Sequence, residues 1–130
     1  MDVIEVSSQR RRQLVDVTTY VQEAVAASAV TAGVAHVAVP HTTAAVLLNE
    51  NADPAVGDDI LRALEAMLPA IAWRHAEGNS DAHLLSTLVG HSVTVPIAEG
   101  ELALGRWQAV YLLELDGPRK REIWITCLGA

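Results

Sequence analysis

The sequence contains no phenylalanine, and aromatic side chains make up only 4% of its 130 residues. The core must therefore be built from valine, leucine, isoleucine and alanine, which dominate a hydrophobic content of 51%. Branched aliphatic side chains pack well in strands, and a chain of this length has the usual size of one domain. We therefore expect a single domain over residues 1–130, with some apolar surface left for subunit contacts.

Cysteine is almost absent, since Cys127 is the only one. No disulfide can form within the chain, and a zinc site built from several cysteines is excluded. Cys127 lies in an apolar run, which predicts a core position. The chain also lacks both a run of about eighteen apolar residues and an apolar N-terminal segment, so neither a membrane helix nor an export signal is predicted. These features predict a cytoplasmic location.

Positive charge is scarce, because nine basic residues stand against sixteen acidic ones and leave a net charge of −7. Such a surface repels a phosphate backbone and argues against nucleic-acid binding. The motifs G-x-S-x-G, P-loop and G-x-G-x-x-G do not occur. Hydrolases, nucleotide-binding proteins and dehydrogenases therefore lose their usual support. Small-molecule ligands remain compatible with this composition.

Apolar periodicity divides the chain into strands and helices. Asp16 or Thr18 is expected to cap the first helix, and Gly33 to end it. Proline at position 54 suits the first turn of the second helix. Strands are predicted over residues 3–8, 33–40, 41–48, 91–97, 107–115 and 122–128, and helices over 18–30, 55–68 and 82–89. The predicted class is α+β, with mostly antiparallel strands and helices packed against them.

Two hairpins are predicted from the turn residues. Arg10 to Arg12 are expected to form the charged turn of the first, before residues 13–17. Asp116 to Pro118 are expected to join the last two strands into a terminal hairpin. By position alone, the basic residues 119–121 that follow this turn are expected to be solvated.

Three of the five histidines lie between His75 and His91. His75 and His83 are separated by a polar turn that holds Glu77, Asn79 and Asp81. Imidazole nitrogens beside carboxylates suit a divalent metal such as zinc. The alternative is a structural loop in which Asp81 caps the helix that begins at residue 82.

Three segments of the sequence resemble the YjbQ family, whose members are also called secondary thiamine-phosphate synthases. They are HTTAAVLLNENADP (41–54), HAEGNSDAHLLSTLVGHS (75–92) and LALGRWQAVYLLELDGPR (102–119). The resemblance implies a small α+β protein that assembles as a homotrimer, with polar clefts at the subunit boundaries. It also implies a phosphorylated small-molecule substrate and a weak thiamine-phosphate synthase activity, in which pyrophosphate leaves a pyrimidine diphosphate.

The resemblance picks out most of the candidate residues, whereas the chemistry that the reaction needs assigns their roles and adds Arg119. As ligands of a divalent metal, zinc-like or magnesium, we expect His41, His75 and His83. As catalytic carboxylates we expect Glu50 and Asp81. As substrate-binding groups we expect Asn51, Asn79, Gln108 and Arg119, beside Trp107. The sequence departs from the family pattern at Leu85, where a lysine is frequent, and at Arg106, where a small hydroxyl residue is frequent. His36 and His91 lie outside the strongest matches and are expected to be structural.

Two functions are compatible with these residues. The first is a metal-assisted enzyme in which Glu50 or Asp81 orients a ligand or acts as general base. The second is a non-catalytic trimer that binds a metal or a small anion at its subunit boundaries. Nothing in the residue spacing alone specifies the substrate.

Overall fold

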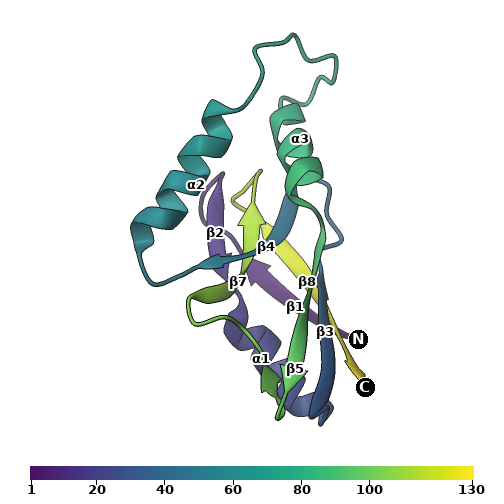
Figure 1. Cartoon of the computed structure of the whole chain (residues 1–130). Coiled ribbons are helices and arrows are strands. Elements are labelled where there is room, and N and C mark those ends of the chain that lie inside the picture. Colours follow the sequence, from purple (N-terminus) through teal and green to yellow (C-terminus); the bar gives the residue numbers. More distant parts are fainter.

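The computed structural model describes residues 1–130 and contains eight strands and three helices (Figure 1). The strands are β1 (Asp2–Ser7), β2 (Gln13–Asp16), β3 (Ala32–Ala38), β4 (Ala44–Glu50), β5 (Ser92–Ala98), β6 (Glu101–Leu102), β7 (Gln108–Glu114) and β8 (Lys120–Gly129). The helices are α1 (Thr18–Ser28), α2 (Pro54–Ala66) and α3 (Ser80–Val89). The predicted α+β class is confirmed.

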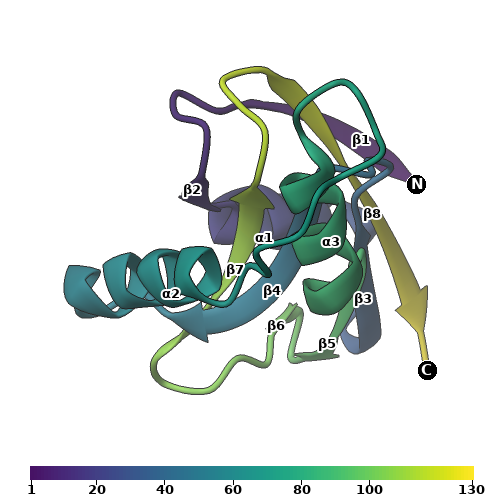
Figure 2. The ribbon, with the colours of Figure 1, turned by 90° about the horizontal axis from the view of Figure 1, so that it is seen from above.

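The strands form two sheets in which all neighbours are antiparallel. The larger sheet has the order β1-β8-β3-β5-β6, and the smaller one has the order β2-β7-β4. In Figure 2, α2 and α3 lie on the same side of the smaller sheet. None of the three helices has both the length and the apolar character needed to cross a lipid bilayer.

The smaller sheet is the middle layer of the molecule, which explains the nearly continuous apolar run of β7. Val110 and Leu112 belong to the main core, which the larger sheet and α1 complete. Leu113 on the opposite face belongs to a second core, where it joins Ala82 and Leu85 of α3. A strand buried on both faces cannot alternate between polar and apolar residues. The smaller sheet is therefore covered on one face by α3 and on the other by α1 and the larger sheet.

Both predicted hairpins are wrong. β1 pairs with β8 and β2 pairs with β7, so the arginine turn connects two different sheets. β7 and β8 also belong to different sheets, although a tight turn joins them. Each turn therefore carries the chain from one layer of the sandwich to the other. Turn residues identify the change of direction, whereas the choice of partner depends on burial of the whole strand face.

Helix α1 ends earlier than predicted, and Gly33 does not end it. The helix ends at Ser28, and Ala29 takes up the left-handed conformation that closes it, with φ 59°. Gly33 instead lies in β3, where a Cβ atom would be 1.9 Å from the carbonyl oxygen of Leu128 in β8. Its missing side chain allows two strands to approach closely.

Helix α2 confirms the prediction made from its sequence. The Asp53 side chain accepts a hydrogen bond from the backbone N–H of Ala55, and Pro54 occupies the first turn. No residue of α2 is fully buried, although Leu61 and Leu64 pack against the second core. This helix therefore lies on the surface of the sandwich and leaves a groove along its inner side.

Candidate functional site

His75 and His83 lie together at the start of α3. Their ring centroids are 5.4 Å apart, with the rings edge to face at 84°. Together with Ser80 they line an open hollow on the surface. His75 Nδ1 lies 3.1 Å from the Ser80 hydroxyl, and its Nε2 lies 3.7 Å from Glu77. The two imidazoles that were predicted to share a ligand are thus adjacent.

His41 is bonded to β8. Its Nε2 accepts a hydrogen bond of 2.8 Å from the backbone N–H of Glu122. The proton of the neutral ring therefore sits on Nδ1, because a backbone N–H can only donate. Burial, and then the positive charge of Arg121, lower the pKa of His41, so the ring is held neutral. In one chain, no group of three or more His, Cys, Asp or Glu residues is arranged to hold a metal ion.

Asp81 lies in the first turn of α3, and Asn79 rather than Asp81 occupies the N-cap position. The Asp81 carboxylate accepts hydrogen bonds from Arg11, at 3.0 and 3.2 Å, and from Arg12. Arg12 also pairs with Glu65 of α2. Arg11 and Arg12, in the turn between β1 and β2, thus fasten α3 to the rest of the chain, and Arg12 also fastens α2. Both arginines donate to the Asp81 carboxylate.

Asn79 and Arg119 meet at the same carboxylate. Asn79 Nδ2 donates to Asp116 Oδ2 at 2.9 Å, and Arg119 Nη2 donates to the same oxygen at 3.1 Å. Arg119 Nε also donates to the Asp116 carbonyl. These bonds tie the start of α3 to the turn after β7. Two of the predicted substrate-binding residues, Asn79 and Arg119, are therefore adjacent. Both donate to Asp116 and do not point into an open cleft.

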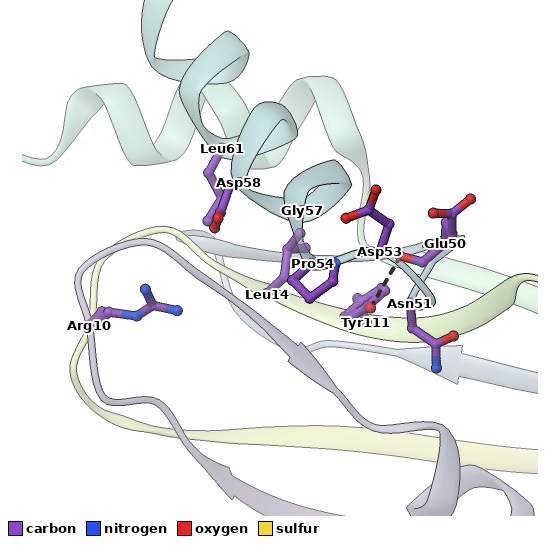
Figure 3. A pocket seen from close by; sticks show the side chains of 10 residues that line it. All are labelled: Arg10, Leu14, Glu50, Asn51, Asp53, Pro54, Gly57, Asp58, Leu61 and Tyr111. Atoms are coloured by element: carbon purple, nitrogen blue, oxygen red, sulfur yellow. Dashed lines mark hydrogen bonds between the residues drawn. The ribbon is translucent and has the colours of Figure 1, made fainter.

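Glu50 and Asn51 line a separate groove between the start of α2 and the smaller sheet (Figure 3). Tyr111 also lines it, and its hydroxyl donates to the Glu50 carbonyl at 3.3 Å. Burial, and then the charges of Asp16 and Glu50, raise the pKa of Tyr111. This groove shares no lining residue with the hollow of His75 and His83. In one chain, the predicted base and the predicted metal ligands are not brought together.

Gln108 and Trp107 follow the loop that precedes β7. Gln108 Oε1 accepts the backbone N–H of Gly105 at 2.8 Å, so its side chain closes this loop. The Trp107 side chain is exposed, and the Arg106 guanidinium lies over its ring at 4.8 Å. The Trp107 carbonyl accepts the backbone N–H of Asn51. The loop is thereby attached to the end of β4, beside the groove.

Comparison with known proteins identifies the family of this chain. Residues 2–130 match the family described as UPF0047 protein YjbQ-like. The chain belongs to the YjbQ/UPF0047 family. It is 45% identical over 127 residues to a UPF0047 protein of Methanocaldococcus jannaschii, covering 96% of this chain and 91% of that protein. It is 38% identical over 134 residues to UPF0047 protein YugU of Bacillus subtilis, with 99% of each covered.

Crystal structures of YjbQ-like proteins have the same fold. An uncharacterized conserved protein of the YjbQ/UPF0047 family from Clostridium acetobutylicum superposes with a TM-score of 0.95 and 40% identity, covering 98% of this chain and 100% of the other. A YbjQ-like protein of unknown function from Sulfolobus solfataricus gives 0.92 and 38% identity, covering 99% and 96%. Family and fold are thus shown together, and the descriptions of these relatives assign no reaction.

One buried ion pair in this YjbQ-family chain was missed by the sequence reasoning. Arg121, expected to be solvated, is 3% exposed as a side chain and pairs at 2.5 Å with Glu114, which is 0% exposed. Arg121 also donates to the carbonyl and hydroxyl oxygens of Thr43, both at 2.9 Å. Glu114 accepts further bonds from Ser8 and two backbone N–H groups. The alternation of residues in β8 could have predicted that Arg121 is buried, because position 121 shares its face of the strand with Ile123 and Ile125.

Each of the two histidines expected to be structural, His36 and His91, has a ring nitrogen within hydrogen-bond distance of a hydroxyl group. His91 Nε2 lies 3.0 Å from the hydroxyl of Ser86, which also donates to the Ala44 carbonyl. His36 Nδ1 lies 3.1 Å from the Thr94 hydroxyl across the β3–β5 pair. Neither lies among the groups that line the two hollows.

Proposed function

We propose that this chain forms a homotrimer, binds a divalent metal through His75 and His83 at the subunit boundary, and acts there on a phosphorylated small molecule. The observation that carries the proposal is the exposed pair of imidazoles, with ring centroids 5.4 Å apart in an open hollow. The first reaction to test is thiamine-phosphate formation with loss of pyrophosphate, to which the family resemblance points.

The residues fit a metal only in part, and this supports a site shared between subunits. Two imidazoles supply nitrogen ligands, and the Ser80 hydroxyl beside His75 Nδ1 can fix the orientation of that ring. Catalytic zinc sites use three protein ligands, so a second copy has to contribute the third. His41 would need to release its bond with Glu122 or lose its Nδ1 proton before it could serve. A bound metal would supply Lewis-acid stabilisation of the departing phosphate oxygens.

Glu50 is the better candidate for general base. Asp81 accepts bonds from two arginines, whereas the Glu50 carboxylate has neither an ion-pair nor a hydrogen-bond partner within the chain. A carboxylate that takes up a proton must reach the substrate. We therefore propose that Asp81 positions α3 and that Glu50 acts from a neighbouring subunit's cleft or from its own groove.

The outer face of the larger sheet supports the trimer. No helix covers it, and beyond Lys120 and Glu122 at the start of β8 its three central strands present uncharged, mostly small side chains toward solvent. These are Val34, His36 and Ala38 of β3, Ser92, Thr94 and Pro96 of β5, and Trp124, Thr126 and Leu128 of β8. A largely uncharged face is costly to leave in water. In a three-fold assembly, each copy can pack one part of this face against a different part of its neighbour's face.

Sedimentation is expected to give three times the chain mass of 13.9 kDa at micromolar concentration. Thr94→Arg, in the middle of the uncharged face, is expected to shift the species toward the monomer because three buried charges would repel one another. Thr19→Arg, on exposed α1, is the matched control and is expected to remain trimeric. A monomeric wild-type protein would contradict the assembly.

Metal analysis tests the histidine pair. Purified protein is expected to retain one divalent ion per chain, and zinc affinity is expected to fall in His83→Ala by more than the ~10–100-fold that loss of an outer partner costs. His91→Gln, which alters a histidine outside the hollow, is expected to keep the ion. Equal metal content in the wild type, His83→Ala and His91→Gln would contradict metal binding at the histidine pair.

One observation favours the alternative, a protein that binds without turnover. No lysine or arginine lines the hollow of His75 and His83, and Arg119 is occupied by Asp116. A pyrophosphate leaving group needs cationic partners. If neither copy supplies one, a metal or small anion would be held without reaction.

A further inference from the structure

The groove beside α2 is the best-enclosed hollow of the chain, and its chemistry is not explained by the metal proposal. Its volume is about 170 Å³. This lies below the roughly 300–1,000 Å³ of sites for drug-sized ligands, so it suits a compound of amino-acid size. The middle of the groove is apolar, with Leu14 on one wall and Pro54, Gly57 and Leu61 of α2 on the other (Figure 3).

Charges of both signs surround this apolar middle. In Figure 3 the Arg10 guanidinium points into the gap between its loop and α2, where Asp58 stands on the helix side. Glu50 and Asp53 lie together at the opposite end, beside Asn51. None of the four charged side chains has an ion-pair partner within the chain, although the next two arginines, 11 and 12, both do.

We propose that this groove binds a small basic amino acid, with its carboxylate on Arg10, its α-ammonium on Asp58, its methylene chain along Leu14 and Gly57, and its terminal cation between Glu50 and Asp53.

The positions of the charges, rather than their sum, select this class of compound. The groove carries one positive and three negative side chains, and a ligand with one carboxylate and two cationic groups opposes each pole with its complement. A simple diamine would leave Arg10 facing a cation, and a neutral amino acid would leave the carboxylates at the far end without a partner. Glu50 is half-buried and the other three charged side chains are exposed, so each pairing contributes modestly and a ligand that pairs all of them is favoured by the sum.

The surroundings support a cation at the Glu50 end. Burial raises the pKa of Tyr111, and the negative charges of Asp16 and Glu50 add to that rise, so two carboxylates act on this part of the groove. Asp53 holds the Ala55 N–H with Oδ1 only, so Oδ2 remains free for a ligand. Asn51 is fixed by its bond to Asp16, and its side-chain oxygen is free to accept. Acceptors therefore outnumber donors at this end.

This inference shares Glu50 with the proposed function but does not depend on the metal or on turnover. Binding is measured directly, so loss of zinc or of activity would leave it intact. Conversely, failure to bind the amino acid would leave the histidine site untouched.

The test is calorimetry or NMR titration of the purified full-length protein with lysine and two truncated probes. Cadaverine lacks only the carboxylate, and norleucine lacks only the terminal ammonium. We expect lysine to bind at least ~10-fold more tightly than either probe, since a charge-assisted hydrogen bond contributes about that much. Equal affinity for lysine and cadaverine would mean general attraction of cations to an acidic surface, and would overturn the proposal. So would no binding of lysine at millimolar concentration.

Two variants make the test specific to the groove. Gly57→Leu is expected to abolish lysine binding by filling the apolar middle, whereas Gly57→Ala is the control because its Cβ would lie 3.4 Å from Leu14 Cδ1 and leave the groove open. Arg10→Gln, on an exposed loop, is expected to make lysine and cadaverine bind equally. Unchanged lysine binding in both Gly57→Leu and Arg10→Gln would place the ligand elsewhere and overturn the assignment.

Discussion

Arg121→Met is expected to lower the free energy of unfolding by about 3–5 kcal/mol, the cost of leaving a buried charge without its partner. Glu114 is 0% exposed and would lose the guanidinium that donates to both of its oxygens. The Thr43 carbonyl would lose a buried donor as well. Urea denaturation, followed by fluorescence or circular dichroism, measures the loss as a lower midpoint.

Arg119→Met is the matched control, because it removes an arginine two positions away whose side chain is 49% exposed. Exposed pairs contribute roughly 0–1 kcal/mol, so its midpoint is expected to change little. A double variant, Glu114→Leu with Arg121→Met, is expected to recover part of the loss because no unpaired charge remains. If Arg121→Met and Arg119→Met unfold at the same urea concentration, the buried pair contributes no net stability.

The same pair predicts a pH dependence of stability. Burial alone would raise the pKa of Glu114, but hydrogen bonds from Arg121, Ser8 and the Asp116 N–H, with the charge of Arg121, bring that pKa below its usual value of 4.5. The contribution of Glu114 is therefore fully present above pH 4.5 and is lost as the pH falls through the lower pKa of the folded state. In Arg121→Met, burial acts unopposed by the guanidinium, so the deficit against wild type is expected to shrink from pH 7 toward pH 4.

Glu50→Gln is expected to reduce turnover by ~10²–10⁴-fold if Glu50 is the general base. The amide keeps the shape of the side chain but cannot accept a proton at neutral pH. The assay follows thiamine phosphate formed from its pyrimidine diphosphate and thiazole phosphate precursors, with metal content measured in the same samples. Because His75 and His83 are unchanged, the variant is expected to retain its metal.

Asp81→Asn separates positioning from proton transfer. Its carboxylate is bonded to Arg11 and Arg12, so this variant is expected to lower the melting temperature and to reduce rate by much less than Glu50→Gln. If Asp81→Asn lost more rate than Glu50→Gln and kept the wild-type melting temperature, Asp81 would be the general base and Glu50 the positioning residue. No turnover in wild type, combined with a melting temperature that falls when metal is removed, would favour the binding protein, since a metal bound to the folded state stabilises it.

Local patterns in the sequence were sufficient for the elements and for the neighbours within one segment. The helical spacing of residues 55–68, with Asp53 and Pro54 before it, predicted α2 and its capping side chain. His75 and His83 face each other because a short polar turn and the start of α3 connect them, so a few backbone angles decide their geometry. The motifs around them also sufficed for the family.

The tertiary structure alone decided every contact between distant strands. The sequence could not show that turns at residues 8–12 and 115–119 change sheets, because pairing depends on which faces are buried together. That choice buries Arg121 on Glu114, holds His41 against β8 instead of beside His75, and puts Glu50 in a groove with Arg10. Residue type and periodicity determined what this chain can form locally, whereas the stacking of two sheets, and the removal of water between them, determined which charged groups meet.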